Sequence, residues 1–284
     1  MELRANNGVL LKRKDSLDLL SKVDRLPSLP CVLIDVRNVM EDPESGIFDL
    51  SAAIEKDQST SAMVLKFANS AVYNPNGRKY STLNDAVARL GMAQTADIAN
   101  AMSIMQGVAI SKDANKTQAF WIHCFGVGLM ARLLASIVDP STKIIHPENA
   151  FMIGLLHEIG RVAIASNVDY CYFNDDVSIL SGLEAREYDE KNYGISHSEA
   201  AGFIMNAWGF PDQLTENIVH FYDGDTPILK VCRYAESIVD TNCAQINTFE
   251  GMIESVSEYV KGKDAQNNAI NSLCEKPDGF HQIG

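Results

Sequence analysis

Closely spaced pairs of cysteines are absent from this 284-residue sequence, although it contains six cysteines. They are widely scattered without a C-x-x-C pair, and most fall inside apolar helical patterns, where a thiol serves as a small hydrophobic side chain. The six are Cys31, Cys124, Cys171, Cys232, Cys243 and Cys274. This usage is typical of a protein in a reducing cytosol.

Basic residues and long apolar runs are also scarce. The chain has 24 Lys and Arg against 37 Asp and Glu, which gives a formal net charge of -13. This charge opposes attraction to phosphate backbones, and only Lys12-Arg13-Lys14 offsets it locally. Val9-Leu10-Leu11 is too short for a secretory core, and no uninterrupted apolar run approaches the length of a bilayer crossing. We therefore expect a soluble, cytoplasmic protein that binds neither nucleic acid nor membranes directly.

Motifs for nucleotide binding and for zinc hydrolysis are missing too. Neither G-x-x-x-x-G-K-[ST] nor G-x-G-x-x-G occurs, and His157-Glu158 is followed by Gly160-Arg161 where H-E-x-x-H would place a second histidine. His197-Ser-Glu199 matches the H-x-E piece of zinc deaminases, but the P-C-x-x-C partner is absent and a helix capping box already explains Glu199. These classes of enzyme are excluded.

Alternating strand patterns are nearly absent, whereas helix start and stop signals recur along the chain. Ser196 and Glu199, for example, form a capping box, and Gly91 suits a helix end. The signals predict a helix that begins at Leu50 after Asp49, and further helices over 60–68, 81–91, 118–138, 147–157, 200–208, 211–220, 227–240 and 248–260. With 46% hydrophobic residues to form a core, the sequence predicts an all-α fold.

Polar segments suggest where this helical pattern is interrupted. The stretch 111–116 is the most plausible internal boundary, and the tail after Lys261 is expected to be poorly ordered. A solvated region with loop character is predicted from the acidic residues Asp169, Asp175, Asp176, Glu184, Glu187, Asp189 and Glu190.

The most informative segment sets an imidazole beside a carboxylate in a predicted apolar helix, Gly154-Leu-Leu-His157-Glu158-Ile-Gly160-Arg161. Neutral histidine and ionised carboxylate are ligands for divalent metals, and adjacent helical positions lie about 100° apart, so both can reach one pocket. The alternative is a core histidine that donates its ring proton to a carbonyl, with Glu158 facing solvent.

Further histidines strengthen the metal interpretation. His123, His157, His197 and His220 fall on four different predicted helices, and helical bundles build metal sites by projecting ligands inward from several helices. His220 has an equal alternative, in which its charge complements the dipole at a helix C-terminus. Glu236, on an amphipathic helix, could complete the site or simply face water.

The order of motifs along the chain is distinctive. The first half contains Leu26-Pro-Ser-Leu-Pro30, Ile54-Glu-Lys-Asp57, Val64-Leu-Lys-Phe-Ala-Asn69-Ser70-Ala71 and Asp85-Ala86-Val-Ala-Arg-Leu90-Gly91. The second half contains Phe120-Trp121-Ile-His123, the His157-Glu158 segment, Gly194-Ile-Ser-His197, Ala207-Trp208-Gly-Phe-Pro211 and His220. In this order the motifs resemble the bacterial HDOD domain, a regulatory relative of the HD-type metal-dependent phosphohydrolases. The resemblance implies a two-lobed helical fold with an N-terminal lobe over 15–115, an HD-like lobe over 116–240, and a C-terminal helix and flexible tail over 241–284.

The resemblance also implies a site. In catalytic relatives, histidines and aspartates at these places hold one or two metals that activate water against a phosphoester. Carried over to this chain, the candidate metal ligands are His123, His157, Glu158, His197, His220 and Glu236. Glu158 and Arg161 are the candidate catalytic residues, since Arg161 stands where many active relatives have a phosphate-contacting lysine. The metal would be divalent manganese, iron, nickel, magnesium or zinc.

Three departures from the family pattern bear on catalysis. Glu158 and Glu236 stand where aspartate is expected, and Phe221 stands where a second histidine is common. Each glutamate adds a methylene that moves its carboxylate by more than about 1 Å, which disturbs an octahedral or bridging geometry. The departures disfavour turnover.

We therefore predict a cytoplasmic bacterial signal-transduction module of HDOD type, which binds a signalling protein or a small-molecule effector and has a degenerate, non-catalytic HD site. A homodimer is one assembly to expect. The alternative is a metal-dependent phosphohydrolase, a phosphodiesterase acting on a nucleotide or a cyclic dinucleotide.

Overall fold

The computed structural model describes residues 12–22, 31–70, 73–74, 76–108, 110–111, 113–138, 145–173 and 182–261. All regular elements within these ranges are α-helices, which confirms the predicted all-α fold. Parts of the sequence predictions lie outside them, namely Val9-Leu10-Leu11, the motif at 26–30, Ala71, Lys112, Asp175 and Asp176, and the tail after Lys261, which includes Cys274.

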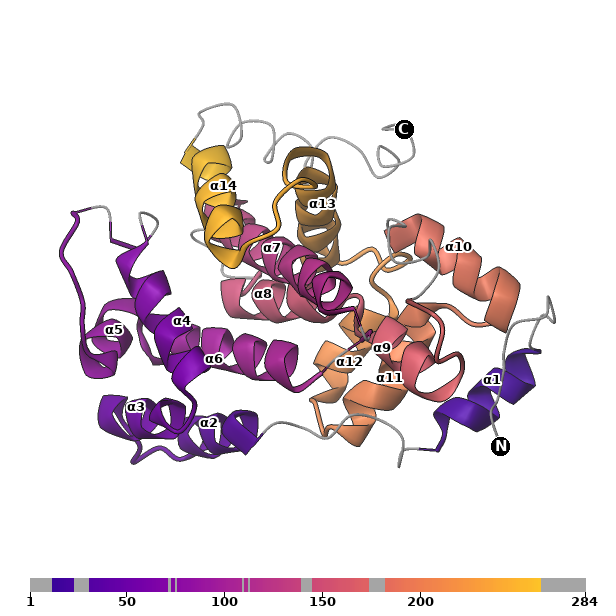
Figure 1. Cartoon of the computed structure of the whole chain (residues 1–284), viewed down its shortest axis with the longest axis horizontal. Coiled ribbons are helices and arrows are strands. Elements are labelled where there is room, and N and C mark those ends of the chain that lie inside the picture. The colour runs from indigo at the N-terminus through magenta and orange to yellow at the C-terminus, as the bar shows by residue number, and fades with distance from the viewer. Residues whose placement is uncertain are drawn as a thin grey trace.

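A first group of helices surrounds α6 (Met92–Gly107). In Figure 1 this group lies at the lower left, and its other members are α2 (Cys31–Glu41), α3 (Ile47–Glu55), α4 (Gln58–Asn69) and α5 (Leu83–Leu90). All four pack against α6. The start of α3 differs from its prediction, because Asp49 accepts the Gly46 backbone N–H at 2.8 Å from inside the first turn and does not precede the helix.

A second group is built around the long helix α7 (Ala114–Val138), against which α8 (Pro147–Leu156), α13 (Pro227–Asn242) and α14 (Phe249–Lys261) pack. Helices α7 and α8 cross closely, since a Cβ on Gly154 would lie 2.8 Å from the Cα of Gly128. Only glycine permits this approach. By length and composition α7 could cross a bilayer, but 72% of its most apolar window is buried inside the fold, as in a core helix.

The second group also contains helices that pack on one another beside α8. Helix α9 (Ile159–Asn167) packs against α11 (His197–Ala207), and α11 packs against α12 (Asp212–Val219). The capping box predicted for α11 is confirmed, since the Ser196 Oγ accepts the Glu199 N–H at 3.2 Å and the Glu199 carboxylate accepts the Ser196 N–H at 3.2 Å.

Helix α1 (Arg13–Leu20) lies against this second group rather than against α2–α6 (Figure 1). The Asn167 amide donates to the carbonyls of Leu19 and Lys22, at 3.3 Å each. Ser16 donates to the Tyr193 carbonyl at 2.7 Å. The division of the chain near residue 115 stays a prediction, but α1 packs with helices from the C-terminal side of that position.

The two groups also meet through Arg132 of α7. Its guanidinium lies 3.0 Å from Asp97 of α6 and 3.4 Å from Glu148 of α8. Burial raises the pKa of Asp97 to about 7, since the desolvation of the carboxylate outweighs the opposite effect of Arg132. The two groups are also connected by the ion pair between Lys66 of α4 and Glu250 of α14.

The predicted solvated acidic loop is wrong in part: Glu184, Glu187 and Glu190 are exposed as expected, and Asp169 lies outside the helices, but the other features differ. Glu184, Glu187, Asp189 and Glu190 lie on a helix, α10 (Gly182–Tyr193). Asp169 and Asp189 are buried, because Tyr193 and Tyr172 donate hydrogen bonds to their carboxylates at 2.9 and 2.8 Å. Buried carboxylates need such partners, and the partners are invisible in a local sequence window.

Candidate metal centre

His157 and Glu158 form a turn between α8 and α9, which corrects the prediction that they lie inside one helix. The His157 Nδ1 lies 2.6 Å from the Gly154 carbonyl, which can only accept, so Nδ1 carries the proton. On the other side of the turn, Gly160 lets α9 approach α11, since a Cβ there would lie 1.7 Å from the His197 carbonyl oxygen. The turn holds both side chains in the interior, where His157 is 0% and Glu158 1% exposed.

A first ligand group is formed by His123 of α7, His157 and Glu236 of α13, whose ligand atoms lie within 4.8 Å of one another. The His157 Nε2 is 3.5 Å from Oε1 of Glu236 and has no hydrogen-bond partner. Asp240, one turn further along α13, lies with Oδ1 3.4 Å from Nδ1 of His123. An unpaired, buried imidazole nitrogen that faces a carboxylate fits a metal ligand.

A second group lies beside the first and consists of Glu158, Arg161, His197 and Asp189. Asp189 accepts hydrogen bonds from the ring Nδ1 of His197 at 2.7 Å and from its backbone N–H at 3.1 Å. This leaves the His197 Nε2 facing Oε1 of Glu158 at 3.5 Å, again without a hydrogen-bond partner. The other carboxylate oxygen of Glu158 binds the Arg161 guanidinium at 2.5 Å.

Tyr222 joins the two groups. Its hydroxyl donates to Oε1 of Glu236 at 2.8 Å and lies 3.3 Å from Oε1 of Glu158. Gly182, at the start of α10, packs directly on this hydroxyl, because a Cβ there would lie 1.8 Å from it and 2.4 Å from the Glu236 carboxylate. The two carboxylates are therefore tied together and covered from one side.

Opposing electrostatic effects act on the ionisable groups of the centre. Burial alone would raise the pKa of Glu158, but Arg161, His197 and His157 hold it well below its usual range. Burial lowers the pKa of His123 to about 4, and the neighbouring His157 adds to this. For His157 itself, burial lowers the pKa but Glu236 and Glu158 raise it by more. An ionised carboxylate beside a neutral His123 is the protonation state that a divalent ion requires.

The side chains of the centre differ in exposure. His123 and Asp240 are 29% and 37% exposed, whereas the side chains of His157 and His197 are 0% and that of Glu158 is 2% exposed. Solvent therefore contacts the first ligand group at His123 and its neighbour Asp240.

His220 does not join the other predicted ligands. It ends α12, its side chain is 61% exposed, and its Nδ1 lies 3.0 Å from Asp223. The next residue, Phe221, turns inward, with its ring centroid 4.8 Å from that of His157. The remaining predicted ligands, His123, His157, Glu158, His197 and Glu236, converge, with Arg161 beside Glu158.

Three residues of the centre were not predicted. Asp240 could have been found, because it lies four positions after Glu236 and hence on the same face of a helix. Asp189 and Tyr222 gave no signal, since their roles depend on contacts with His197 and Glu236, which lie on other elements of the fold.

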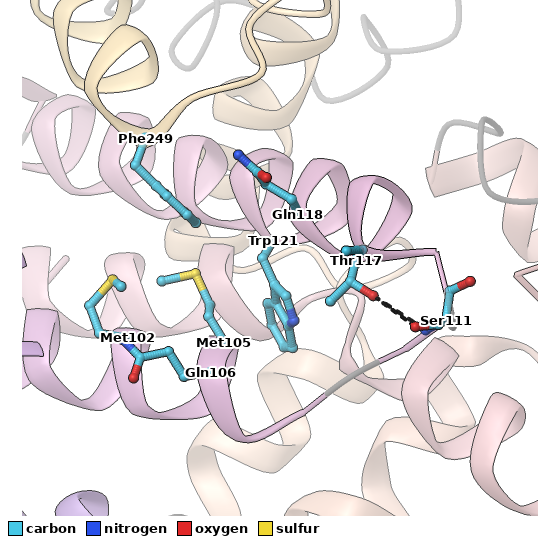
Figure 2. A pocket seen from close by; sticks show the side chains of 9 residues that line it. Met102, Met105, Gln106, Ser111, Thr117, Gln118, Trp121 and Phe249 are labelled. Atoms are coloured by element: carbon cyan, nitrogen blue, oxygen red, sulfur yellow. Dashed lines mark hydrogen bonds between the residues drawn. The ribbon is translucent and has the colours of Figure 1, made fainter. Parts of the chain in front are cut away.

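A separate pocket of about 410 Å³ lies between the end of α6, the start of α7 and the start of α14 (Figure 2). Met102, Met105, Trp121 and Phe249 provide its apolar side chains, and the other lining residues are Gln106, Ser111, Ala114, Thr117 and Gln118. The Trp121 indole N–H is held by the Val108 carbonyl at 3.0 Å. Trp121 precedes the ligand His123 by two residues, so α7 serves both places.

Comparison with known proteins agrees with this fold. The chain matches the HDOD domain family over residues 26–223 and therefore belongs to that family. It is 20% identical over 233 residues to an uncharacterized protein of Treponema pallidum (strain Nichols), an alignment that covers 80% of this chain. The chain spans 44% of the length of that relative.

Solved structures share the fold. A Geobacter sulfurreducens HDOD domain protein of unknown function has a TM-score of 0.65 at 19% identity, with 93% of this chain and 99% of that chain covered. A proposed phosphohydrolase from Shewanella amazonensis SB2B has a TM-score of 0.63 at 23% identity, with 90% and 97% covered. A proposed signal transduction protein from Marinobacter aquaeolei VT8 has a TM-score of 0.63 at 20% identity, with 92% and 65% covered. At these identities the likeness establishes the fold.

Proposed function

We propose that this chain is a non-catalytic regulatory HDOD module, and that its HD-like centre holds a divalent metal as a fixed part of the fold. The observation that carries the proposal is the enclosure of Glu158, whose side chain is 2% exposed and bound to the equally buried Arg161. A phosphohydrolase needs a carboxylate that can serve the metal and a cation that can meet the substrate. In this chain those two groups neutralise each other.

A divalent ion would be held by His123, His157 and Glu236, with Asp240 within reach of His123. Two imidazoles and a carboxylate suit manganese, iron, nickel or zinc. Bound there, the ion would neutralise the acidic cluster and link α7, the 157–158 turn and α13. That role stabilises the fold without requiring a substrate.

The alternative remains a metal-dependent phosphohydrolase, and two observations favour it. The histidine–carboxylate set is the kind such enzymes use, and two Shewanella amazonensis SB2B relatives in fold are proposed phosphohydrolases, one of them metal-dependent. The enclosed ion pair of Glu158 and Arg161 weighs against it in this chain.

Metal addition to purified apoprotein tests both functions. Manganese or nickel should raise the unfolding temperature of the wild type. At a metal concentration 100 times the dissociation constant, the free energy of unfolding should increase by about 2.7 kcal/mol. His157→Ala should lose this effect, whereas the exposed His220→Ala should keep it. The loaded protein should not hydrolyse bis-(p-nitrophenyl) phosphate or cyclic dinucleotides. Turnover that disappears in folded His157→Ala would establish the enzyme instead.

A small-molecule effector, one of the two predicted kinds of partner, is supported by the pocket beside Trp121. Its volume of about 410 Å³ suits a small organic molecule, and its thioether and aromatic walls favour a mostly apolar one. Polar groups stand at Thr117 and Gln118 (Figure 2). A protein partner and a homodimer stay predictions.

The two tryptophans make this pocket measurable. Trp208→Phe leaves Trp121 as the single reporter, and saturable quenching of its fluorescence by 1-anilinonaphthalene-8-sulfonate is expected. Ala114→Phe, which fills the pocket wall, should abolish the quenching, whereas Ala119→Phe on the exposed side of α7 should preserve it. Equal quenching in both variants would place the dye elsewhere.

A further inference from the structure

The two halves of the centre, which are the first group with Glu236 and the second group with Glu158, differ in the cation or histidine that faces each carboxylate. Glu236 faces His157 and His123, whereas Glu158 is bound through Oε2 to the guanidinium of Arg161 at 2.5 Å. We propose that Arg161 is a resident cation in the position of a second metal ion, so that the centre binds a single divalent ion at His123, His157 and Glu236. This inference rests on the metal centre of the proposed function.

Arg161 is held in place by more than its ion pair. Its guanidinium carbon lies 5.9, 5.5 and 5.4 Å from the ring centroids of Phe120, Tyr172 and Phe173. Rings at this range attract a cation, most strongly where water is excluded, and the Arg161 side chain is only 5% exposed. A guanidinium stays charged in such a setting, so the positive charge beside Glu158 is permanent.

The second half would otherwise be suited to a metal. Asp189 binds Nδ1 of His197 and aims Nε2 at Glu158, which is the arrangement that orients metal-binding histidines. The Nε2 lies 3.5 Å from Oε1 of Glu158 and has no hydrogen-bond partner. A second ion at these atoms would share the Glu158 carboxylate with a fixed positive charge. The repulsion between the two cations excludes it.

The same geometry changes the role expected for Arg161. The family resemblance implies a phosphate-contacting cation at this position. In the structure one guanidinium nitrogen binds Glu158, and three aromatic rings surround the group. Arg161 therefore completes the centre from within and does not face a ligand.

Ion counting in solution tests the inference without relying on activity. Apoprotein is titrated with manganese or nickel by calorimetry, and the bound metal is counted by mass spectrometry after dialysis. The wild type should bind one ion per chain, and His157→Ala should bind none. His197→Ala should still bind one ion, and its affinity should change by less than about tenfold. A loss of about tenfold or more is typical when a group that orients a metal ligand is removed, and His197 does not have that role for this ion.

Removing the resident cation gives the complementary result. Arg161→Met, which keeps an unbranched apolar side chain but removes the charge, should bind two ions per chain, and the added ion should be lost in Arg161→Met/His197→Ala. Circular dichroism confirms folding of each variant, and if Arg161→Met does not fold, the wild-type count decides alone. Two ions in the wild type, or one in folded Arg161→Met, would overturn the inference. No ion in the wild type would instead refute the metal centre itself.

Discussion

Gly160 lies against the backbone of His197 so closely that a Cβ at position 160 would be 1.7 Å from the carbonyl oxygen of His197 and 2.6 Å from the Ala201 nitrogen. This contact brings α9 onto α11 and thereby sets Glu158, two residues before Gly160, opposite the His197 ring. The distance between Glu158 and His197, both in the second group of the centre, therefore depends on the absence of one methyl group at position 160.

Gly160→Ala should therefore destabilise the protein, because backbone atoms cannot move aside as a flexible side chain could. An overpacking cost of about 3 kcal/mol is expected, measured as the free energy of unfolding in urea. Gly202→Ala on α11 is the matched control, since its Cβ would make an ordinary contact of 3.4 Å with Val219. Equal stability of the two variants would contradict the close packing of α9 on α11.

Asp189→Asn should also destabilise the fold, because the neutral amide cannot accept hydrogen bonds from His197 and Tyr172 as the carboxylate does. A loss of about 1.5–3 kcal/mol is expected for charged hydrogen bonds of this kind. The control is Glu187→Gln on the same helix, where the side chain is exposed. Thermal unfolding of both variants measures the difference. Equal unfolding temperatures would show that Asp189 is solvated like Glu187 and does not anchor the helix.

Gly182→Ala should weaken metal binding without removing a ligand. The new Cβ would meet the Tyr222 hydroxyl at 1.8 Å and the Glu236 carboxylate at 2.4 Å, so both side chains must shift. A loss of about 10- to 100-fold in affinity is expected when a group that positions a ligand moves. Calorimetric titration with nickel measures it, and the alanine variant of the distant Gly46, with nothing within 4 Å of its Cβ, should bind as the wild type does.

Stability should fall as pH rises through the region where Asp97 ionises. Burial raises the pKa of Asp97 from 3.8 to about 7, so the folded state binds its proton more tightly than the unfolded state does. The contribution is fully present below pH 3.8 and is lost progressively up to about pH 7. Asp97→Asn should flatten this slope in urea unfolding at pH 5 to 8, and an unchanged slope would show that Asp97 is ionised throughout.

Several helices that the sequence predicted have clear start signals, such as α11 with Ser196 and Glu199 and α8 with Pro147 in its first turn. Helix α6 was missed because its apolar residues point in all directions, so it has no periodic stripe. Helix α10 was missed because its acidic residues suggested solvent, whereas Asp189 is buried by partners from other elements. A local pattern carries no information on such partners.

The convergence of His123, His157 and Glu236 followed from the motif order together with the general rule that bundles gather ligands from several helices. The turn at His157–Glu158 did not follow, because the apolar residues on both sides suggested one continuous helix. His220 was expected in the centre but lies outside it, because the end of α12 turns its side chain toward solvent. The next residue, Phe221, contacts the His157 ring instead. Helix ends are decided by packing that the sequence does not show.

Helix α7 carries Trp121 on the wall of the pocket and, two residues later, His123 in the metal centre. If a ligand in the pocket displaced this helix, it would also move His123, and occupancy of the pocket would then change the free energy of metal binding. By thermodynamic linkage the effect is reciprocal: whatever factor a pocket ligand applies to metal affinity, the metal must apply to the ligand. The chain would then report the availability of its metal through its response to an effector.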